Sequence, residues 1–281
     1  MADPTQATPP KLLDVARQAA RTRHLSRRTE ASYVSWIRRY IFFHGKRHPS
    51  TMGAPDVAKF LSWLATERHV SASTQNQALS ALLFLYKDVL HIEIGPVERV
   101  IRALVPKRLP IVLSRHEVQA LLGCLDGVIW IISTLLYGGG LRLQECLELR
   151  VKDLDFDRSQ IVIRRGKGQK DRVTILPSVV RQKLVAHLDW VRAQHAKDLE
   201  SGLGRAVLPE ALDRKYPGAA TEWSWQFVFP AGRICRDPRW GPPSRYHMHE
   251  SVVQPAIARA ATAAGLTKRP VGPHTLRSVS A

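Results

Sequence analysis

The sequence predicts a mainly helical protein of two domains, the second of which also contains a small antiparallel sheet. Three observations lead to this fold class. Amphipathic helical patterns fill the chain up to residue 90, a proline-containing basic stretch follows, and two β-rich runs joined by glycines come later. With 281 residues, the chain is long enough for two ordinary domains with cores of their own.

Helical periodicity defines the first domain. Apolar residues recur at spacings of three and four before Gly45, and they are Tyr33, Trp36, Ile37, Tyr40 and Ile41. This pattern predicts a helix over residues 27–44. Similar patterns predict one helix over residues 56–68 and another from Ser73, its expected N-cap, to Leu90. The first domain should therefore be an all-helical bundle.

A proline-containing basic stretch marks the domain boundary. Residues 105–110 read Val-Pro-Lys-Arg-Leu-Pro, which is a poor continuation of any helix. We therefore expect an N-terminal extension over residues 1–21, the helical domain over 22–105, a linker over 106–112 and the second domain over 113–281.

The second domain combines helices with a hairpin. Ser114 and Glu117 form a capping-box pattern, and the apolar helix that follows ends at the three glycines 138–140. The β-rich runs 160–164 and 172–176 flank a turn with two glycines, which predicts an antiparallel hairpin. The other predicted elements are a short helix over 141–150, helices over 179–195 and 248–264, and a short strand over 226–229.

The charge of the chain indicates an anionic partner. Lys and Arg total 42 against 24 Asp and Glu, a formal net charge of +18. Since 44% of the residues are hydrophobic and 23% are charged, this excess belongs to a folded protein and not to a disordered basic tail. Nucleic acid is favoured, because binding releases counterions from phosphates, and an anionic membrane surface is the alternative.

The sequence indicates neither secretion nor metal binding. No apolar run approaches the ~20 residues that span a bilayer, and the N-terminus has no signal-peptide core, so we expect a cytoplasmic protein. Cys124, Cys146 and Cys235 are widely spaced and odd in number, which favours buried free thiols. A zinc site formed by Cys235, His247 and His249 is the alternative; we expect no metal and no other cofactor.

Three motifs hold cationic or imidazole side chains where the backbone is fixed or closely approachable. Arg142 follows three glycines at a helix start, where its guanidinium and free amides could share an anion. Lys167 lies between two glycines at a hairpin tip, which allows close approach to a phosphate. His274 and Arg277, three residues apart, share one face of a helical turn. Taken singly, each motif is weak.

Taken together in this order behind a basic helical domain, the motifs at 140–145, 166–172 and 274–277 resemble those of the tyrosine recombinases, the phage integrase family. The resemblance covers residues 20–281. It implies a SAM-like, four-helix-type core-binding domain and an α+β tyrosine-recombinase catalytic domain that close around DNA. It also implies strand exchange through a 3′-phosphotyrosine, without a metal or a high-energy cofactor.

The resemblance assigns roles to particular residues. Arg142 matches the first catalytic arginine, Lys167 matches the general acid for the leaving 5′-oxygen, and His274 and Arg277 match the H-x-x-R pair. Two guanidiniums suit this reaction, because the nonbridging oxygens of an attacked phosphodiester become more negative. Glu145, one turn after Arg142, is expected to orient the arginines.

Other side chains are expected to contact DNA away from the reacting phosphate. These residues lie at helix starts of the first domain and on the hairpin, and they are Arg27, Arg28, Thr74, Gln75, Gln77, Lys170 and Arg172. A solvated helix face is the alternative interpretation of the arginines in the first domain.

Residues 199–226 resemble the insertion typical of integron integrases, whose DNA sites are folded single strands with extrahelical bases. Because aromatic rings capture such bases by stacking, Trp223, Trp225 and His247 are candidate base-capture residues. The alternative is that the tryptophans fill a core. The expected partners are integron recombination sites, both as duplex and as folded single strand.

The sequence departs from the family after Arg277. The family continues with a second histidine or tryptophan and then the nucleophilic tyrosine, whereas all six tyrosines here precede His274. We expect a chain truncated by a frameshift or fragmentation, which cannot cleave or join DNA alone. The family's C-terminal helix also docks on a neighbouring protomer, which puts homo-oligomeric assembly on DNA in doubt.

Three functional interpretations stay open. The first is an integron-type site-specific recombinase with an incomplete sequence. The second is a catalytically inactive DNA-binding protein, a remnant or competitor at recombination sites. The third is a recombinase of the phage or chromosome-dimer-resolution type.

Overall fold

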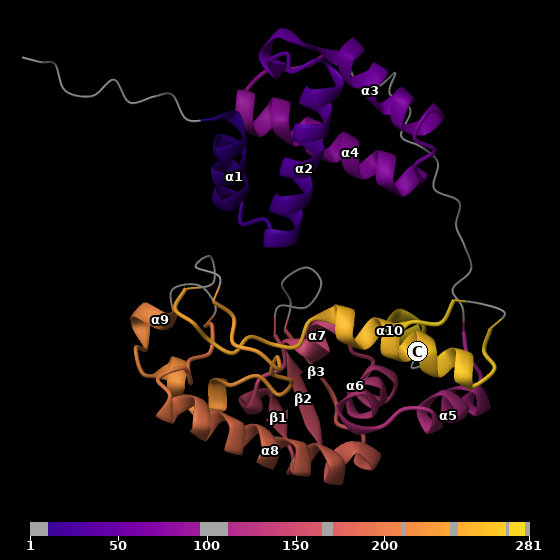
Figure 1. Ribbon diagram of the computed structural model, residues 1–281, viewed down its shortest axis with the longest axis vertical. Coiled ribbons are helices and arrows are strands. Elements are labelled where there is room, and N and C mark those ends of the chain that lie inside the picture. Colours follow the sequence, from indigo (N-terminus) through magenta and orange to yellow (C-terminus); the bar gives the residue numbers. More distant parts are fainter. Residues whose placement is uncertain are drawn as a thin grey trace, which may run out of the picture. The chain divides into compact units, whose positions relative to one another are not determined.

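A computed structural model describes residues 11–95, 112–164, 171–208, 212–236, 241–267 and 270–278. The chain divides into two compact units, Met1–Arg108 and Leu109–Ala281 (Figure 1). Each unit has its own hydrophobic core. In the part of the chain that is described, no helix is both long and apolar enough to cross a membrane.

The first unit is an all-helical bundle, as its periodicity predicts. Its elements are α1 (Leu12–Thr22), α2 (Arg27–Phe43), α3 (Ala54–Thr66), α4 (Ala72–Phe84) and a π-helical continuation of α4 (Leu85–Leu90). The apolar face of α2 buries Trp36, Ile37 and Tyr40. At the centre of the bundle the hydroxyls of Tyr40 and Tyr86 share a 2.9 Å hydrogen bond, which satisfies both buried groups.

Two details of this unit differ from the sequence-based expectations. The sequence predicts an N-terminal extension over residues 1–21, whereas α1 packs on the bundle through its buried Ala16 and Ala20. The N-cap of α4 is Ser71 and not Ser73, because the Ser71 hydroxyl accepts a hydrogen bond from the Thr74 amide at 3.3 Å. Both serines satisfy the sequence rule, and the exposed Ser73 lies within the first turn.

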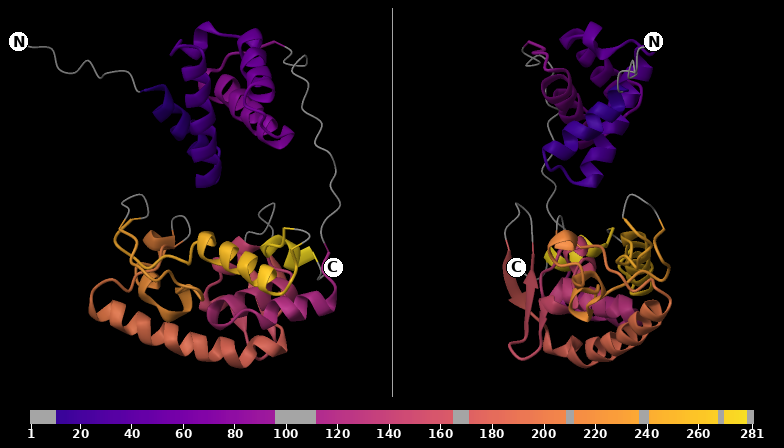
Figure 2. Two further views of the ribbon diagram at one scale, coloured as in Figure 1. Left: turned by 45° about the vertical axis from the view of Figure 1, so that its right-hand side comes forward. Right: turned by 90° about the vertical axis from the view of Figure 1, so that its left-hand side faces the viewer.

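The second unit packs helices on both sides of α6 and places a small sheet at one edge (Figures 1 and 2). Its helices are α5 (Arg115–Gly123), α6 (Gly127–Gly138), α7 (Leu143–Leu147), α8 (Arg181–Glu200), α9 (Leu212–Lys215), α10 (Glu250–Ala263) and α11 (Pro273–Ser278). The predicted capping box of α5 is present: the Ser114 amide donates to Glu117 at 2.7 Å, and the Glu117 amide donates to the Ser114 hydroxyl at 3.2 Å.

The sheet consists of β1 (Leu154–Asp155), β2 (Gln160–Ile163) and β3 (Arg172–Ile175) in the order β1-β2-β3. The predicted hairpin is confirmed, since β2 and β3 are antiparallel with Ile163 opposite Arg172. The predicted strand over 226–229 is wrong. Within the described residues it makes only an isolated bridge, between Arg150 and Phe227.

The three cysteines differ in burial. Cys146 is buried in the core of the second unit, and burial raises the pKa of its thiol. Cys235 is half-buried and Cys124 is exposed, so the expectation of buried thiols is wrong for Cys124. All three are free thiols.

Candidate active site

The glycines between α6 and α7 create a tight turn. Gly140 has a φ of +62°, in the left-handed region that favours glycine. A Cβ added to Gly139 would lie 2.9 Å from the Leu135 carbonyl oxygen and 3.2 Å from the Ile175 carbonyl oxygen, so β3 packs directly on this turn. The turn therefore requires glycine both for its backbone angles and for its close approach to the sheet.

Arg142 and Glu145 are tied together at the start of α7. Glu145 accepts hydrogen bonds from the Arg142 amide at 2.8 Å and from Nη1 of the Arg142 guanidinium at 2.5 Å. The Glu145 side chain is 9% exposed, whereas that of Arg142 is 36% exposed. The amide of Arg142, which sequence analysis left open to an anion, is thus occupied by Glu145, and the guanidinium remains partly accessible.

Polar side chains of β3 form hydrogen bonds with the glycine turn. Nη2 of Arg172 donates to Glu145 at 2.8 Å and lies 3.5 Å from the Gly140 carbonyl oxygen. Two residues further along the strand, the Thr174 hydroxyl donates to the Gly139 carbonyl at 2.8 Å. The sequence predicts that Arg172 contacts DNA; the structure places its guanidinium beside Glu145.

The C-terminal motif joins the same turn. His274 and Arg277 belong to α11, and Nε of Arg277 donates to the Gly140 carbonyl oxygen at 3.1 Å. Arg277 is half-buried, and His274 is exposed. The structure therefore brings Arg142, Glu145, Arg172 and Arg277 together around Gly140. We call these four side chains the arginine cluster.

Charges within the arginine cluster shift the ionisation of its members. Burial would raise the pKa of Glu145, but the hydrogen bonds from Arg142 and Arg172 outweigh it, and the pKa is lowered. Burial lowers the pKa of Arg277, and the nearby positive charges of Arg142 and Arg172 lower it further. Three arginines around one carboxylate leave net positive charge, which suits an anionic ligand.

Lys167 and Lys170 lie outside the described residues. The strands beside them are described: β2 ends at Ile163 and β3 begins at Arg172, next to the arginine cluster.

The predicted DNA contacts of the first unit have three different environments. Thr74 and Gln77 line an open groove on α4 together with Ser73, Asn76 and Ser80. The Gln75 amide instead donates to the Leu61 carbonyl at 3.1 Å, so this side chain packs towards α3. Arg27 and Arg28 are exposed in the first turn of α2.

The candidate base-capture residues have separate environments. Trp223 is half-buried and packs against the core of the second unit, with the Arg192 guanidinium 4.9 Å from its ring centre. Trp225 is half-buried, and the Lys152 ammonium lies 2.7 Å from its ring centre. His247 is buried, which contradicts a surface role; its Nδ1 donates to the Met248 carbonyl at 2.7 Å, and burial lowers its pKa.

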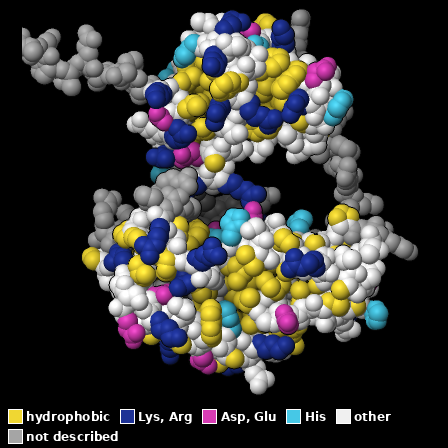
Figure 3. Space-filling view, viewed as in Figure 1, with side chains coloured by type: hydrophobic (Ala, Val, Ile, Leu, Met, Phe, Trp, Pro, Cys, Tyr) yellow, Lys and Arg dark blue, Asp and Glu magenta, His cyan; other side chains and the backbone are white. Residues whose placement is uncertain are grey.

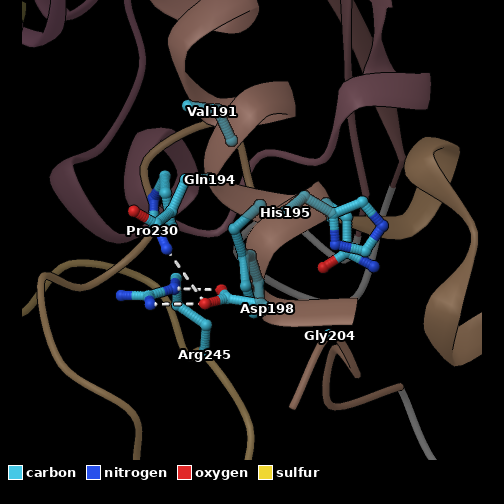
Figure 4. A pocket seen from close by; sticks show the side chains of 9 residues that line it. Val191, Gln194, His195, Asp198, Gly204, Pro230 and Arg245 are labelled. Carbon is cyan, nitrogen blue, oxygen red and sulfur yellow. Dashed lines mark hydrogen bonds and ion pairs between the residues drawn. The ribbon is translucent and has the colours of Figure 1, made fainter. Parts of the chain in front are cut away.

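The segment that carries these aromatic residues is anchored by two arginines that sequence analysis missed. The buried Arg150 donates to the carbonyls of Trp225 and Val207, both at 2.6 Å. Arg245 forms a two-pronged pair with Asp198 of α8, at 2.5 and 2.8 Å, beside a small pocket (Figure 4). No signal in the sequence joins positions 47 residues apart, so only the fold reveals this pair.

No group of three His, Cys, Asp or Glu side chains that could hold a metal ion occurs among the described residues. His249, one member of the alternative zinc set, caps α10: its Nδ1 accepts a hydrogen bond from the Ser251 amide at 3.2 Å.

Comparison with known families agrees with this geometry. Residues 12–96 match the N-terminal SAM-like domain of phage integrases, and residues 112–281 match the phage integrase family itself. The chain therefore belongs to the phage integrase family of tyrosine recombinases.

Three named relatives show the similarity along the chain. An integrase/recombinase of Escherichia coli and one of Pseudomonas aeruginosa are each 47% identical to this chain over 267 residues, which is 95% of this chain and 79% of theirs. Tyrosine recombinase XerA of Thermococcus onnurineus is 33% identical over 163 residues, 56% of this chain and 54% of XerA.

Solved structures share the fold at low sequence identity. A lambda integrase tetramer bound to a Holliday junction matches with a TM-score of 0.60 and 16% identity, covering 96% of this chain and 68% of that one. The Tn1549 transposon integrase in complex with transposon right end DNA matches with a TM-score of 0.58 and 14% identity, covering 96% and 85%. The mainly helical fold with a small antiparallel sheet is thus the lambda integrase-like fold.

Proposed function

We propose that the chain is a DNA site-specific recombinase of integron type, in which Arg142, Lys167, His274 and Arg277 serve one phosphodiester. The observation that supports a recombinase site most is that Arg277, 135 residues further along the chain than Arg142, donates to the carbonyl of Gly140, two residues before Arg142. Both guanidiniums are held at one edge by protein oxygens, and each has further N–H groups with which to bind phosphate.

The proposed reaction exchanges one ester bond for another. A tyrosine phenolate attacks the phosphorus, the bond to the 5′-oxygen breaks, and Lys167 gives that oxygen its proton. Arg142 and Arg277 stabilise the charge that develops on the nonbridging oxygens, and His274 donates a hydrogen bond to one of them. Each preorganised donor of this kind contributes on the order of 3 kcal/mol to lowering the barrier.

The nucleophile of this reaction has no counterpart in these 281 residues at the position that the resemblance implies, because all six tyrosines precede His274. The 281-residue chain alone should therefore bind DNA without forming a covalent adduct. The alternative function is that of a DNA-binding protein that occupies recombination sites without cutting them.

DNA would be held by surfaces on both units. Figure 3 shows Lys and Arg side chains over both units on the face in view. Arg27 and Arg28 are exposed in the first turn of α2, where their guanidiniums can contact a DNA phosphate. The hydroxyls and amides that line the α4 groove can donate to and accept from phosphates and base edges.

Adduct formation separates the two candidate functions. The 281-residue chain is incubated with a nicked recombination site and run on a denaturing gel. The proposal expects no shifted band from this chain, and a band from a chain that is extended after Arg277 by a segment carrying a tyrosine nucleophile. Absence of a band from that extended chain, with DNA binding intact, would support the non-cutting protein.

Binding to folded DNA tests the integron assignment. An integron-type protein should bind a folded bottom-strand hairpin with extrahelical bases more tightly than a linear duplex of the same sequence. Trp225→Ala should reduce this preference. Both tryptophans are half-buried, but Trp223 packs against the core of the second unit, so Trp223→Phe serves as the control. Equal binding of hairpin and duplex would favour the phage or chromosome-dimer-resolution type.

A further inference from the structure

β3 has an inverted pattern of burial. Val173 and Ile175 are 57% and 63% exposed, while the polar side chains that alternate with them, Arg172 and Thr174, turn inwards. Because side chains alternate across a strand, a strand at the edge of a core normally directs its apolar residues inwards. The inward face of β3 is therefore used for polar contacts with the glycine turn.

Arg172 contacts both anchors of the candidate catalytic arginines. It donates to Glu145, which also holds Arg142, and it approaches the Gly140 carbonyl, which also holds Arg277. Glu145 is nearly buried, so its charge needs several donors, and Arg172 supplies one of them from the sheet.

We propose that Arg172 is a positioning residue: it draws part of the Glu145 charge away from Arg142 and fixes the Gly140 carbonyl on which Arg277 rests. The inference rests on the proposed function, because it takes Arg142 and Arg277 as the phosphate ligands. Without Arg172, Glu145 has Arg142 as its remaining guanidinium partner among the contacts described here, and it neutralises that charge more strongly. Arg277 then shares its carbonyl with no other guanidinium.

A double-mutant comparison tests this indirect action. The full chain is labelled with ¹⁵N, and the side-chain Nε–H signals of Arg142 and Arg277 are followed during titration with inorganic phosphate. Arg142→Lys and Arg277→Lys assign the two signals by their loss. The titration is repeated for Arg172→Gln, for Glu145→Gln and for the double variant, with thermal unfolding to confirm that each is folded.

The proposal expects Arg172→Gln to weaken phosphate binding about ten-fold. In the Glu145→Gln background the same change should cost at most about two-fold, because no carboxylate charge remains to be shared. A loss of the same size in both backgrounds would show that Arg172 binds phosphate directly, and it would overturn the proposal.

Two further variants distinguish the loss of the Arg172 contacts from a general disruption of β3. Arg172→Lys should recover part of the affinity, since an ammonium can serve Glu145 but cannot reach both anchors as a planar fork does. Thr174→Val removes the neighbouring strand contact with Gly139 and should leave phosphate affinity within about two-fold. An effect of Thr174→Val as large as that of Arg172→Gln would mean that the strand acts only as a support.

The arginine Nε–H signals measured without phosphate test the positioning role independently of the proposed function. Arg172→Gln should move the Arg142 Nε–H signal in the free protein, and it should do so less when Glu145→Gln is present. If phosphate moves neither arginine signal, the phosphate site fails while the positioning role stands on the free-protein shifts. If Arg172→Gln does not move the Arg142 Nε–H signal in the phosphate-free protein, the positioning role is wrong.

Discussion

The second unit contains two arginine–carboxylate groups that differ in what they leave exposed. In the Asp198–Arg245 pair the side chains are 9% and 15% exposed, and the carboxylate receives two hydrogen bonds from Arg245 and one from Gln194. In the arginine cluster the carboxylate is equally buried, but Arg142 and Arg172 remain 36% and 35% exposed. The same residue types form a closed structural tie in one place and an open anion site in the other.

The difference lies in how the carboxylate is shared. Asp198 takes both prongs of one guanidinium, so little of Arg245 is left for a ligand. Glu145 takes a single Nη atom from each of two arginines and a backbone amide. A buried carboxylate that orients several arginines without saturating any of them is suited to a phosphate site.

Breaking the closed pair should have the largest effect on stability. Asp198→Ala leaves the Arg245 charge buried without its carboxylate and should lower the free energy of unfolding by about 3 kcal/mol. Urea unfolding of the full chain measures this. Asp155→Asn, in the exposed pair with Arg158, is the matched control and should cost at most about 1 kcal/mol. Equal losses would contradict the contrast between closed and open pairs.

Breaking the open cluster should instead affect ligand binding. Arg277→Gln should weaken inorganic phosphate binding about ten-fold and change the free energy of unfolding by less than about 1 kcal/mol. Arg245→Gln should instead lower the free energy of unfolding and leave phosphate binding nearly unchanged. A variant of Arg277 that unfolds the protein while sparing phosphate affinity would show that this arginine is structural.

Acid should weaken the contacts of Glu145 and of Asp198, because the pKa of each carboxylate is lowered in the folded protein. The pKa of Glu145 and that of Asp198 are below their ordinary values, since arginine hydrogen bonds outweigh burial in both. The stability from these contacts is complete above the unfolded-state pKa of about 4 and is lost as pH falls through the lower folded-state values. Unfolding measured between about pH 5 and 2.5 should show a flatter decline for Glu145→Gln than for the wild type; parallel curves would contradict this.

The smallest expected effect is at Lys152, above Trp225. Burial lowers the pKa of this ammonium to about 8, so the cost of burying its charge is present below that pH and is relieved as pH rises. Tryptophan fluorescence should change with a midpoint near pH 8, because charge is lost 2.7 Å from the Trp225 ring centre. Lys152→Met and Trp225→Phe should each abolish this step, and its persistence in Trp225→Phe would assign it elsewhere.

The sequence was sufficient for the features that depend on local pattern. Periodicity located the helix that begins at Arg27, and alternation located the hairpin. These predictions hold because each uses a short stretch of chain whose geometry is fixed by its own backbone. The predicted strand at 226–229 was wrong, because an apolar run can also be buried in a segment without a paired partner.

The other features depend on contacts between distant segments. The sequence places Arg172 on a hairpin, where a cation is expected to face DNA. In the structure β3 packs on Gly139, and this packing directs Arg172 towards Glu145. Asp198 and Arg245 carry no motif, and the burial of His247 depends on its neighbours Phe227 and Tyr246. Tertiary packing decides the direction of such side chains, so sequence pattern alone could not place them.

The most direct test of the account asks whether the arginine cluster binds one DNA phosphate. A bound site is selected from random duplexes, and single phosphates are then replaced in turn by neutral methylphosphonates. One position should be found where neutralisation weakens binding of the wild-type chain about ten-fold but does not weaken the Arg142→Gln, Arg277→Gln variant further. If every position weakens both proteins alike, the cluster does not hold a particular phosphate, and the assignment of the active site is contradicted.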